Sequence, residues 1–256
     1  MKRTLLSILL LTFLSAVGVA HPRPASAAQT WAAFQQAGAK AMDEENYEKA
    51  VSLFSAALAE AQASGNQEHA AQSILGVAAA LVDDGKYEEA HKVLAKAVDI
   101  CHLRSPVTHK TRGLLRTMLS HAHHGLGQHD HAVSEASLAL SHLEQDVHAD
   151  EEIVGTLSHL ADLKSAKGDH HEAEALASHA VQLGSQSTAV GADTKAKAHA
   201  THARALANNG NHAEAATAIE KAKSHASVKD TDLHAALDEF LGSLKTQATN
   251  PSASKK

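Results

Sequence analysis

The sequence is poor in cysteine, proline and aromatic residues. It contains one Cys and four Pro, and aromatic side chains make up 3% of its 256 residues. A single Cys excludes an intramolecular disulfide, so the stability of the fold must come from packing. Basic residues are also in deficit: 23 Lys and Arg stand against 29 Asp and Glu. This balance argues against a nucleic-acid partner, because phosphates require a basic surface.

Long apolar runs are missing except at the N-terminus, where one extends from Leu5 to Ala20. It follows Met1-Lys2-Arg3 and precedes Ala25-Ser26-Ala27, a small-residue stretch of the kind that signal peptidases accept. We therefore predict a secretory signal peptide over residues 1–27. The run is shorter than the roughly 20 residues of a spanning helix, which leaves an uncleaved anchor as the weaker alternative.

Cleavage after Ala27 would leave residues 28–256 as the mature chain. Removal of Lys2, Arg3 and Arg23 would make that chain more acidic than the whole sequence. The only Cys, Cys101, lies far from the cleavage region, so no Cys is placed to accept a lipid. We expect a periplasmic or secreted protein without a membrane span.

The remaining composition favours helices. Ala is abundant and loses no side-chain entropy on helix formation. No alternating Val, Ile and Thr segment of the strand type interrupts residues 28–256. The chain is therefore predicted to be all-α.

Five similar segments recur about every 42 residues, and each combines a turn with the start of a helix. Each has a ring-bearing residue followed three positions later by Ala; the ring-bearing residues are Tyr47, Tyr87, His129, His170 and His212. Later positions hold Phe54, Leu94, Ala136, Ala177 and Ile219, then Ala57, Ala97, Ala139, Ala180 and Ala222. Small residues precede each turn at Gly38, Ala78, Ser120, Ala161 and Ala203. This pattern predicts a helix, a tight turn at Gly and a second helix packed closely against the first.

The pattern resembles the tetratricopeptide repeat, and its long period is similar to that of kinesin light chains. Gly85-Lys86-Tyr87-Glu88-Glu89-Ala90 is the best match to the turn motif. The resemblance implies an α-solenoid, a right-handed superhelix of antiparallel helix pairs, with five repeats at about 31–64, 68–104, 106–146, 150–184 and 192–227. His replaces Tyr in the last three repeats, and Ala replaces the bulky residue in repeats three and four. The C-terminal half should therefore be packed more loosely.

The end of the array also has a recognisable pattern. An apolar stripe at helical spacing predicts a capping helix over residues 230–247; it consists of Leu233, Leu237, Phe240, Leu241 and Leu244. Residues 248–256 are predicted to form a disordered tail. Ser105-Pro106 suits the start of the third repeat's first helix.

Sequence signatures of catalysis are missing. No Gly-rich phosphate loop and no G-x-S-x-G elbow occurs. His171-Glu172 opens like a zinc-protease motif, but Ala175 occupies the place of the second His. Cys101 and His102 are adjacent and would point to different faces of a helix, which favours a buried, inert thiol. We predict a non-enzyme without a resident cofactor.

Histidine is the unusual residue, with 21 in the chain. Five lie close together beside Asp130 and form a candidate site for Zn, Cu or Ni; they are His121, His123, His124, His129 and His131. His121 and His124 would share a helix face. Against this interpretation, no two histidines are four residues apart, and His129 is already explained by the repeat. A pH response is a further alternative, because protonated imidazoles would reverse the net charge and weaken packing.

The resemblance also implies a concave groove that receives an extended peptide or a partner's helix. The first helix of each repeat would line it, through Gln35, Met42, Gln72, Leu75, Val82, Thr117, His121, His124, Ser158, Asp162, Lys197 and Arg204. The basic end at Lys197 and Arg204 could accept a carboxylate. We therefore predict an exported scaffold that binds a protein or peptide, with extracytoplasmic metal binding or buffering as the alternative.

Overall fold

The computed structural model describes residues 26–104, 106–227 and 231–249. These ranges form helices and contain no strand, which confirms the all-α prediction. The helices are α2 (Ser26–Asp43), α3 (Tyr47–Ser64), α4 (Gln67–Asp83), α5 (Tyr87–Arg104), α6 (His109–Gly125), α7 (His129–Leu143), α8 (Asp150–Ala166), α9 (His170–Gln186), α10 (Ala192–Asn208), α11 (His212–His225) and α12 (Thr231–Thr249). The predicted signal peptide and tail lie outside the described residues, apart from Ser26, Ala27, Ala248 and Thr249. No helix in the described ranges is long and apolar enough to cross a membrane.

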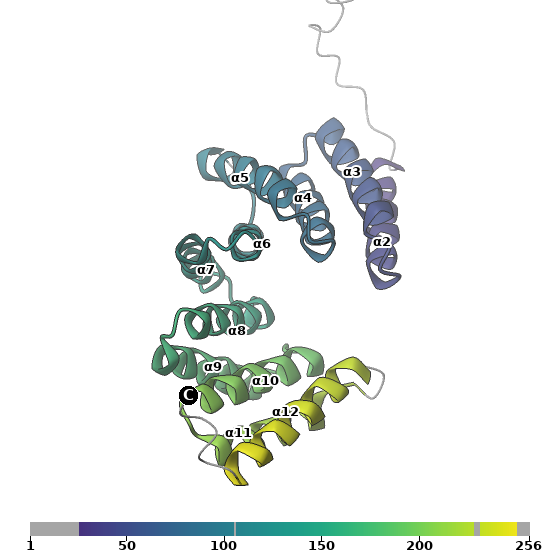
Figure 1. The fold of residues 1–256 in the computed structure, drawn as a ribbon. Coiled ribbons are helices and arrows are strands. Elements are labelled where there is room, and N and C mark those ends of the chain that lie inside the picture. Colours follow the sequence, from purple (N-terminus) through teal and green to yellow (C-terminus); the bar gives the residue numbers. More distant parts are fainter. Residues whose placement is uncertain (1–25, 105, 228–230, 250–256) are drawn as a thin grey trace, which may run out of the picture.

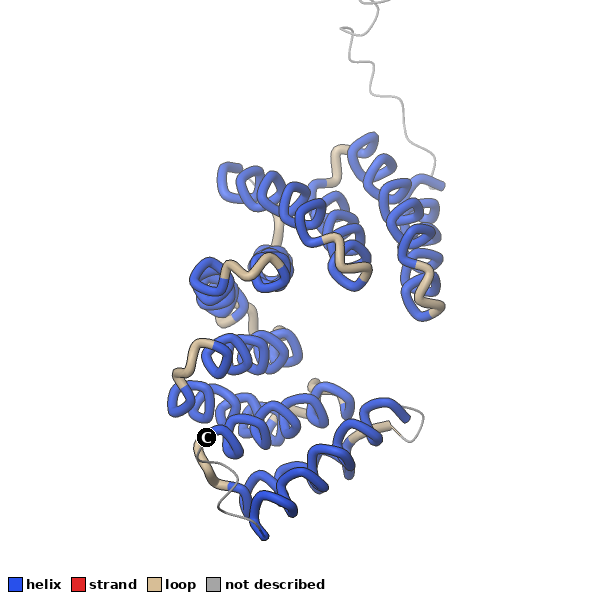
Figure 2. The backbone as a smooth tube through the Cα atoms, in the orientation of Figure 1, coloured by secondary structure: helices blue, strands red, loops and turns tan. Residues whose placement is uncertain are grey.

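The helices pack as five successive pairs that follow a curve (Figure 1). Short loops join the members of each pair (Figure 2). The first helices also contact one another in order, from α2 through α4, α6 and α8 to α10. We call these five the inner helices and their partners, α3, α5, α7, α9 and α11, the outer helices. This is the predicted solenoid of five helix pairs, closed by α12.

Each pair turns through one residue with positive φ. Gly85, Gly127, Gly168 and Gly210 hold this position in repeats two to five, with φ between 72° and 86°. The following backbone N–H then donates to a carbonyl five residues earlier, as Lys86 does to Leu81 at 2.8 Å. This is the hydrogen bond of a Schellman turn, which requires a left-handed residue. The sequence motif therefore encodes the turn through Gly.

The first repeat places Glu45 in this conformation, with φ of 55°. A residue with a Cβ pays about 1–2 kcal/mol for left-handed backbone. Glu45→Gly should therefore raise the free energy of unfolding by about 1 kcal/mol. Urea unfolding followed by circular dichroism measures this change. Glu48→Gly is the control, because Glu48 lies inside α3 and a Gly there should lower the stability. An unchanged stability for Glu45→Gly would show that the backbone of Glu45 is not strained.

Small side chains at the helix crossings are buried as the repeat predicts. The Ala residues of the turn motif are all 0% exposed, and they are Ala50, Ala90, Ala132, Ala173 and Ala215. Phe54 lies between α2 and α4, where a Cβ added at Gly38 or Gly76 would come within 2.7 or 2.5 Å of its ring. Tyr87 packs in the same way on Gly125, with 2.4 Å to an added Cβ. Close helix approach at the rings of Phe54 and Tyr87 thus depends on glycine.

The apolar core changes character along the array. One continuous cluster extends from Ala41 in α2 to Ala122 in α6. Beyond it the core divides into smaller clusters with many Ala residues. The last cluster contains Leu237, Leu241 and Leu244 of α12, which cover the end of the fifth repeat. This division agrees with the looser C-terminal half expected from the smaller side chains.

An acidic residue in the first turn of an inner helix holds the start of the next inner helix. Glu68 of α4 accepts hydrogen bonds from the Thr108 N–H at 2.9 Å and from the Thr111 hydroxyl at 2.5 Å. Thr108 is the N-cap of α6, so the predicted start at Ser105-Pro106 was wrong, and Ser105 lies outside the described residues. Thr108 is the N-cap because its side chain accepts a hydrogen bond from the Thr111 N–H, at 3.2 Å.

The same contact recurs two repeats later. Glu151 of α8 accepts hydrogen bonds from the Gly191 N–H at 2.9 Å and from the Thr194 hydroxyl at 2.6 Å. Both hydrogen bonds lower the pKa of Glu151, and the one from the Thr194 hydroxyl has the larger effect. The carboxylate therefore fixes the distance between successive inner helices at two points of the array.

Glu151→Ala should lower the free energy of unfolding by about 1–2 kcal/mol, since it leaves the Gly191 N–H and the Thr194 hydroxyl without their acceptor. Because the folded pKa is lowered, this stabilisation is present above the unfolded pKa and is lost as pH falls through the folded value. Urea unfolding at pH 7 and pH 3 tests both statements. Glu220→Ala on the exposed surface of α11 is the control; equal losses in the two variants would show that the hydrogen bonds to Glu151 do not stabilise the fold.

Candidate functional site

The inner helices form one continuous surface along the inside of the curve (Figure 1). One position, eight residues before the ring-bearing residue, has an accessible side chain in every repeat. Contacts between successive inner helices place this position on the surface at His121, Asp162 and Arg204. The residues at this position are Ala39, Ala79, His121, Asp162 and Arg204. The surface therefore changes from small and apolar at α2 and α4 to polar and charged at α8 and α10.

The N-terminal part of the surface is tied together by side-chain hydrogen bonds. Gln35 Nε2 and Trp31 Nε1, both on α2, donate to the Ser73 hydroxyl of α4 at 2.9 Å. The Trp31 ring stacks on His69 with centroids 3.7 Å apart. Gln72 donates to Glu68 Oε1 at 3.0 Å. The contacts of Trp31 and Gln35 hold α2 against α4, whereas the Gln72–Glu68 hydrogen bond lies within α4.

The apolar groove residues predicted in this part are half-buried. Met42, Leu75 and Val82 pack against the N-terminal core and keep part of their side chains accessible. They could contribute apolar contacts to a ligand without any rearrangement of the core.

Three imidazoles meet at the centre of the inner surface. His121 of α6 stacks on His159 of α8 with ring centroids 3.7 Å apart and planes 28° apart. His124 meets the edge of His159 at 6.2 Å. His159 Nε2 is also 2.9 Å from the Ser120 hydroxyl, which itself donates to the Ala132 carbonyl across α6 and α7. We call His121, His124 and His159 the inner histidine cluster.

Burial sets the protonation of this cluster. Desolvation, followed by the charge of His124, lowers the pKa of His121 to about 4. Desolvation and the two neighbouring imidazoles lower the pKa of His159 further still. Both rings are therefore neutral at physiological pH, and each can donate one hydrogen bond and accept another.

Sequence reasoning found His121 and His124 and their shared face but missed His159. The signal was available, because His159 takes the place in repeat four that Met118 has in repeat three and Gly76 has in repeat two. Aligning the repeats by position puts residue 159 three before Asp162, on the same helix face. Only the structure shows that α6 and α8 approach closely enough for the rings to stack.

At the basic end of the groove, where a ligand's carboxylate was predicted to bind, Arg204 pairs with the carboxylate of Asp162. Arg204 of α10 donates to both oxygens of Asp162 on α8, at 3.0 and 2.9 Å. It also donates to the Thr201 hydroxyl at 2.9 Å. Arg204 therefore forms a half-exposed ion pair with Asp162 on the inner surface, and its binding of a ligand's carboxylate stays a prediction.

Lys197 is exposed and acts across the inner surface. Burial raises the pKa of Asp83, at the end of α4, and the charge of Lys197 on α10 partly offsets that effect.

Two predicted groove residues do not line the surface. Thr117 and Ser158 are 6% and 8% exposed. The Thr117 hydroxyl is 3.0 Å from that of Thr156, because α8 packs over this part of α6. Ser158 donates to the Val154 carbonyl of its own helix at 2.9 Å. The structure thus corrects these two assignments, since both side chains belong to the contacts between helices.

The five histidines of the candidate metal site are divided between two sides of α6. His121, His124 and His129 lie on the inner side, with His124 and His129 5.3 Å apart by ring centroids. His123 turns the other way, where its Nδ1 is 2.6 Å from Gln128 Oε1 and its ring stacks on His131 at 5.3 Å. The described residues contain no group of three or more His, Cys, Asp or Glu arranged to hold a metal ion.

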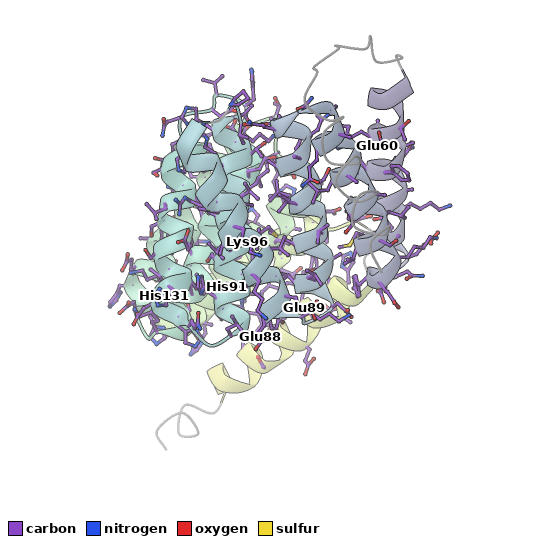
Figure 3. The ribbon with its side chains drawn as sticks, turned by 90° about the horizontal axis from the view of Figure 1, so that it is seen from above. Glu60, Glu88, Glu89, His91, Lys96 and His131 are labelled. Atoms are coloured by element: carbon purple, nitrogen blue, oxygen red, sulfur yellow. The ribbon has the colours of Figure 1, made fainter. Side chains whose placement is uncertain are left out.

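A second histidine group, made of His91, His123 and His131, lies on the outer side of α6. His91 of α5 meets the edge of His123 at 4.8 Å. Figure 3 shows His91 and His131 near each other, on the side of the array that also carries Glu88, Glu89 and Lys96 of α5. Because helix α6 separates this group from the inner histidine cluster, the two cannot share one ion.

No protein-family model and no curated protein sequence matches this chain. Solved structures do match it. A kinesin light chain of Podosopora anserina with nearly identical TPR-like repeats has a TM-score of 0.59 at 18% identity, over 76% of this chain and 93% of that chain. A thermophilic TPR protein of Thermus thermophilus has a TM-score of 0.60 at 17% identity, over 82% and 98%. The Rap conjugation gene regulator of plasmid pLS20, in complex with the Phr* peptide, has a TM-score of 0.67 at 17% identity, over 88% and 62%.

These similarities place the chain in one class of fold. It is a tetratricopeptide-repeat solenoid, with helical repeats of the kind seen in kinesin light chains.

Proposed function

We propose that this protein is an exported, non-catalytic scaffold that binds a peptide or a partner protein along its inner surface. The observation that carries the proposal is the continuous inner surface itself, on which residues of all five inner helices remain accessible. Apolar side chains at α4, neutral imidazoles at α6 and α8, and Lys197 at α10 offer the mixed contacts that an extended peptide requires.

Peptide-bound structures with the same fold support the proposal. The Rap regulator is seen with the Phr* peptide, another Rap protein with Competence and Sporulation Factor, and PlcR of Bacillus thuringiensis with the peptide PapR7 and DNA. Their identities of 14–17% carry the fold and not the partner. The chain's own acidic balance favours a protein or peptide over nucleic acid.

Photo-crosslinking tests the proposal at single positions. A photoreactive phenylalanine analogue at Leu114 should capture the partner from the extracytoplasmic fraction. Leu114 is partly accessible on inner helix α6 and takes the position in repeat three that the predicted groove residue Gln72 has in repeat two. The same analogue at Leu138, which is 43% exposed on outer helix α7, is the matched control. The captured protein should then lose binding when Val82→Asp places a charge on the inner surface. Capture from Leu138 and not from Leu114 would sink the proposal.

Export rests on the N-terminal sequence and has its own test. Mass spectrometry of the protein from the extracytoplasmic fraction should give an N-terminus at Ala28. Replacing Ala27 with Arg should leave a longer precursor, because signal peptidases require small residues there. A protein found only inside the cell with Met1 retained would contradict export and would leave the inner surface as a binding site unaffected.

A further inference from the structure

The junction between repeats three and four has the least extensive packing in the array of helix pairs. Helices α6 and α8 contact each other less than any other successive pair of inner helices does. Helix α7 likewise contacts α8 less than any other outer helix contacts the next inner helix. Every residue of α6, α7 and α8 is described, so this difference belongs to the packing. The junction therefore separates an N-terminal block, α2 to α7, from a C-terminal block, α8 to α11 with its cap α12.

The buried apolar contacts across this junction are small. The large N-terminal cluster ends in α6 and, among the described residues, includes none of α8. The buried residues that join α7 to α8 are Ala132, Ala136, Leu160 and Leu163. An Ala side chain buries little area, and hydrophobic stabilisation scales with the apolar area buried. The hydrophobic effect therefore holds the two blocks together only weakly.

The contact that holds the start of an inner helix also changes at this junction. In repeats two and four, Glu68 and Glu151 accept a hydrogen bond from the backbone N–H at the start of the next inner helix. Lys110 takes the equivalent position in repeat three and pairs with the Glu152 side chain of α8, at 2.7 Å. The N-cap of α8, Ala149, makes no side-chain hydrogen bond. The backbone at the start of α8 therefore lacks the acceptor that a Glu supplies in the other two repeats.

Polar side chains bridge the junction on its inner side. The rings of His121 and His159 stack with centroids 3.7 Å apart. The Ser120 hydroxyl donates its one proton to the Ala132 carbonyl, so the hydrogen bond of 2.9 Å between His159 and Ser120 must be donated by His159 Nε2. This chain of hydrogen bonds joins α8 to α6 and α7. Since water can replace such bonds at a small net cost, polar contacts can open where a large apolar interface would not.

We propose that the junction between repeats three and four is a hinge, that the inner histidine cluster is its latch, and that the hinge sets the width of the inner surface. The loop at residues 144–149 absorbs the motion, since hinges lie in loops and at the ends of helices. When the latch opens, water replaces the contacts of His121 and His159 and the two blocks separate on the inner side. The hinge does not depend on a partner, whereas its use in admitting one rests on the function proposed above.

Pulsed electron paramagnetic resonance between two spin labels tests the hinge in the protein without a partner. Labels are attached to cysteines in a Cys101→Ser background, at a position five residues after the ring-bearing residue that is exposed in every repeat. The junction pair, Ser134→Cys with Thr217→Cys, spans repeats three to five. The control pair, Ser52→Cys with Ser134→Cys, spans repeats one to three and stays within the N-terminal block. The distance distribution of the junction pair should be at least about twice as wide; equal widths would overturn the hinge.

The latch has its own variants. His159→Ala should widen the distribution of the junction pair further and leave the control pair unchanged. His121→Ala removes the other ring of the stack and should act in the same way, while circular dichroism checks that both variants are folded. His179→Ala removes an imidazole from the exposed surface of α9 and should change neither pair. An unchanged junction pair in folded His159→Ala and His121→Ala protein would show that the cluster is not the latch.

The captured partner tests the use of the hinge. Its binding should narrow the distribution of the junction pair, because a ligand that contacts both blocks favours one arrangement of them. A partner that binds along the inner surface and leaves this width unchanged would show that the hinge does not serve binding. That result would leave the proposed function intact, since the widths measured without a partner depend on the hinge alone.

Discussion

Phe54→Ala should lower the free energy of unfolding by about 3–5 kcal/mol, as buried Phe truncations do. Phe54 is 6% exposed, and its ring supplies the three atoms nearest to a Cβ built at Gly38 and the three nearest to one built at Gly76. Its removal leaves a cavity between α2, α3 and α4 that Gly cannot fill. Because repeats contact only their neighbours, the loss should fall mainly on the first two repeats.

Urea unfolding and hydrogen exchange measure the size and the place of this effect. Exchange should accelerate in α2, α3 and α4 and stay nearly unchanged in α10 and α11. Phe240→Ala is the matched control, because Phe240 is only partly buried on α12 and should cost less. A loss below about 1 kcal/mol for Phe54→Ala would show that the ring does not hold the first repeats together.

Lowering the pH from 7 to 5 should destabilise the fold by several kcal/mol. The pKa of His121 and that of His199 are lowered to about 4, and that of His159 lies lower still. In the unfolded chain each imidazole titrates near about 6.5, so the unfolded state binds more protons below that pH. Each His then costs up to about 1.4 kcal/mol per pH unit, and the loss continues until the pH reaches the folded pKa.

The histidines and the carboxylates lower the stability over different pH ranges. Stability should be constant above about pH 7, fall between about pH 6.5 and 4, and fall further at lower pH when Glu151 is protonated. Urea unfolding at half-unit pH steps gives the slope. His121→Phe should reduce that slope by about one His equivalent, whereas His148→Gln on an exposed loop should not. A flat profile between pH 7 and 5 would contradict the buried, neutral imidazoles.

The turn and the core could be predicted from the sequence because each depends on one residue type at one position. Gly85 and Gly127 predict the left-handed turn. Ala50 and Ala90 predict the helix crossings, where both are fully buried. In the first repeat Glu45 takes the position of Gly, yet the surrounding motif still predicted the turn correctly. The fold could therefore be predicted even where one residue does not favour its backbone conformation.

The inner surface was less predictable, because side-chain contacts between repeats depend on distances that no periodicity encodes. Arg204 and Asp162 occupy the same position in successive repeats, so their ion pair could have been found by aligning the repeats. Thr117 could not be assigned correctly, because its burial depends on how closely α8 packs over α6. The division of His123 and His124 followed from helix geometry, because adjacent residues point to different faces, and the structure shows them with different partners on two sides of α6.

Hydrogen exchange of the protein with and without its captured partner tests the central claim most directly, because it reports on every helix at once. Binding along the inner surface should slow exchange in α4, α6, α8 and α10 and leave α5, α7 and α9 unchanged. Protection confined to the outer helices would show that the partner binds the opposite face and that the inner surface is not the binding site.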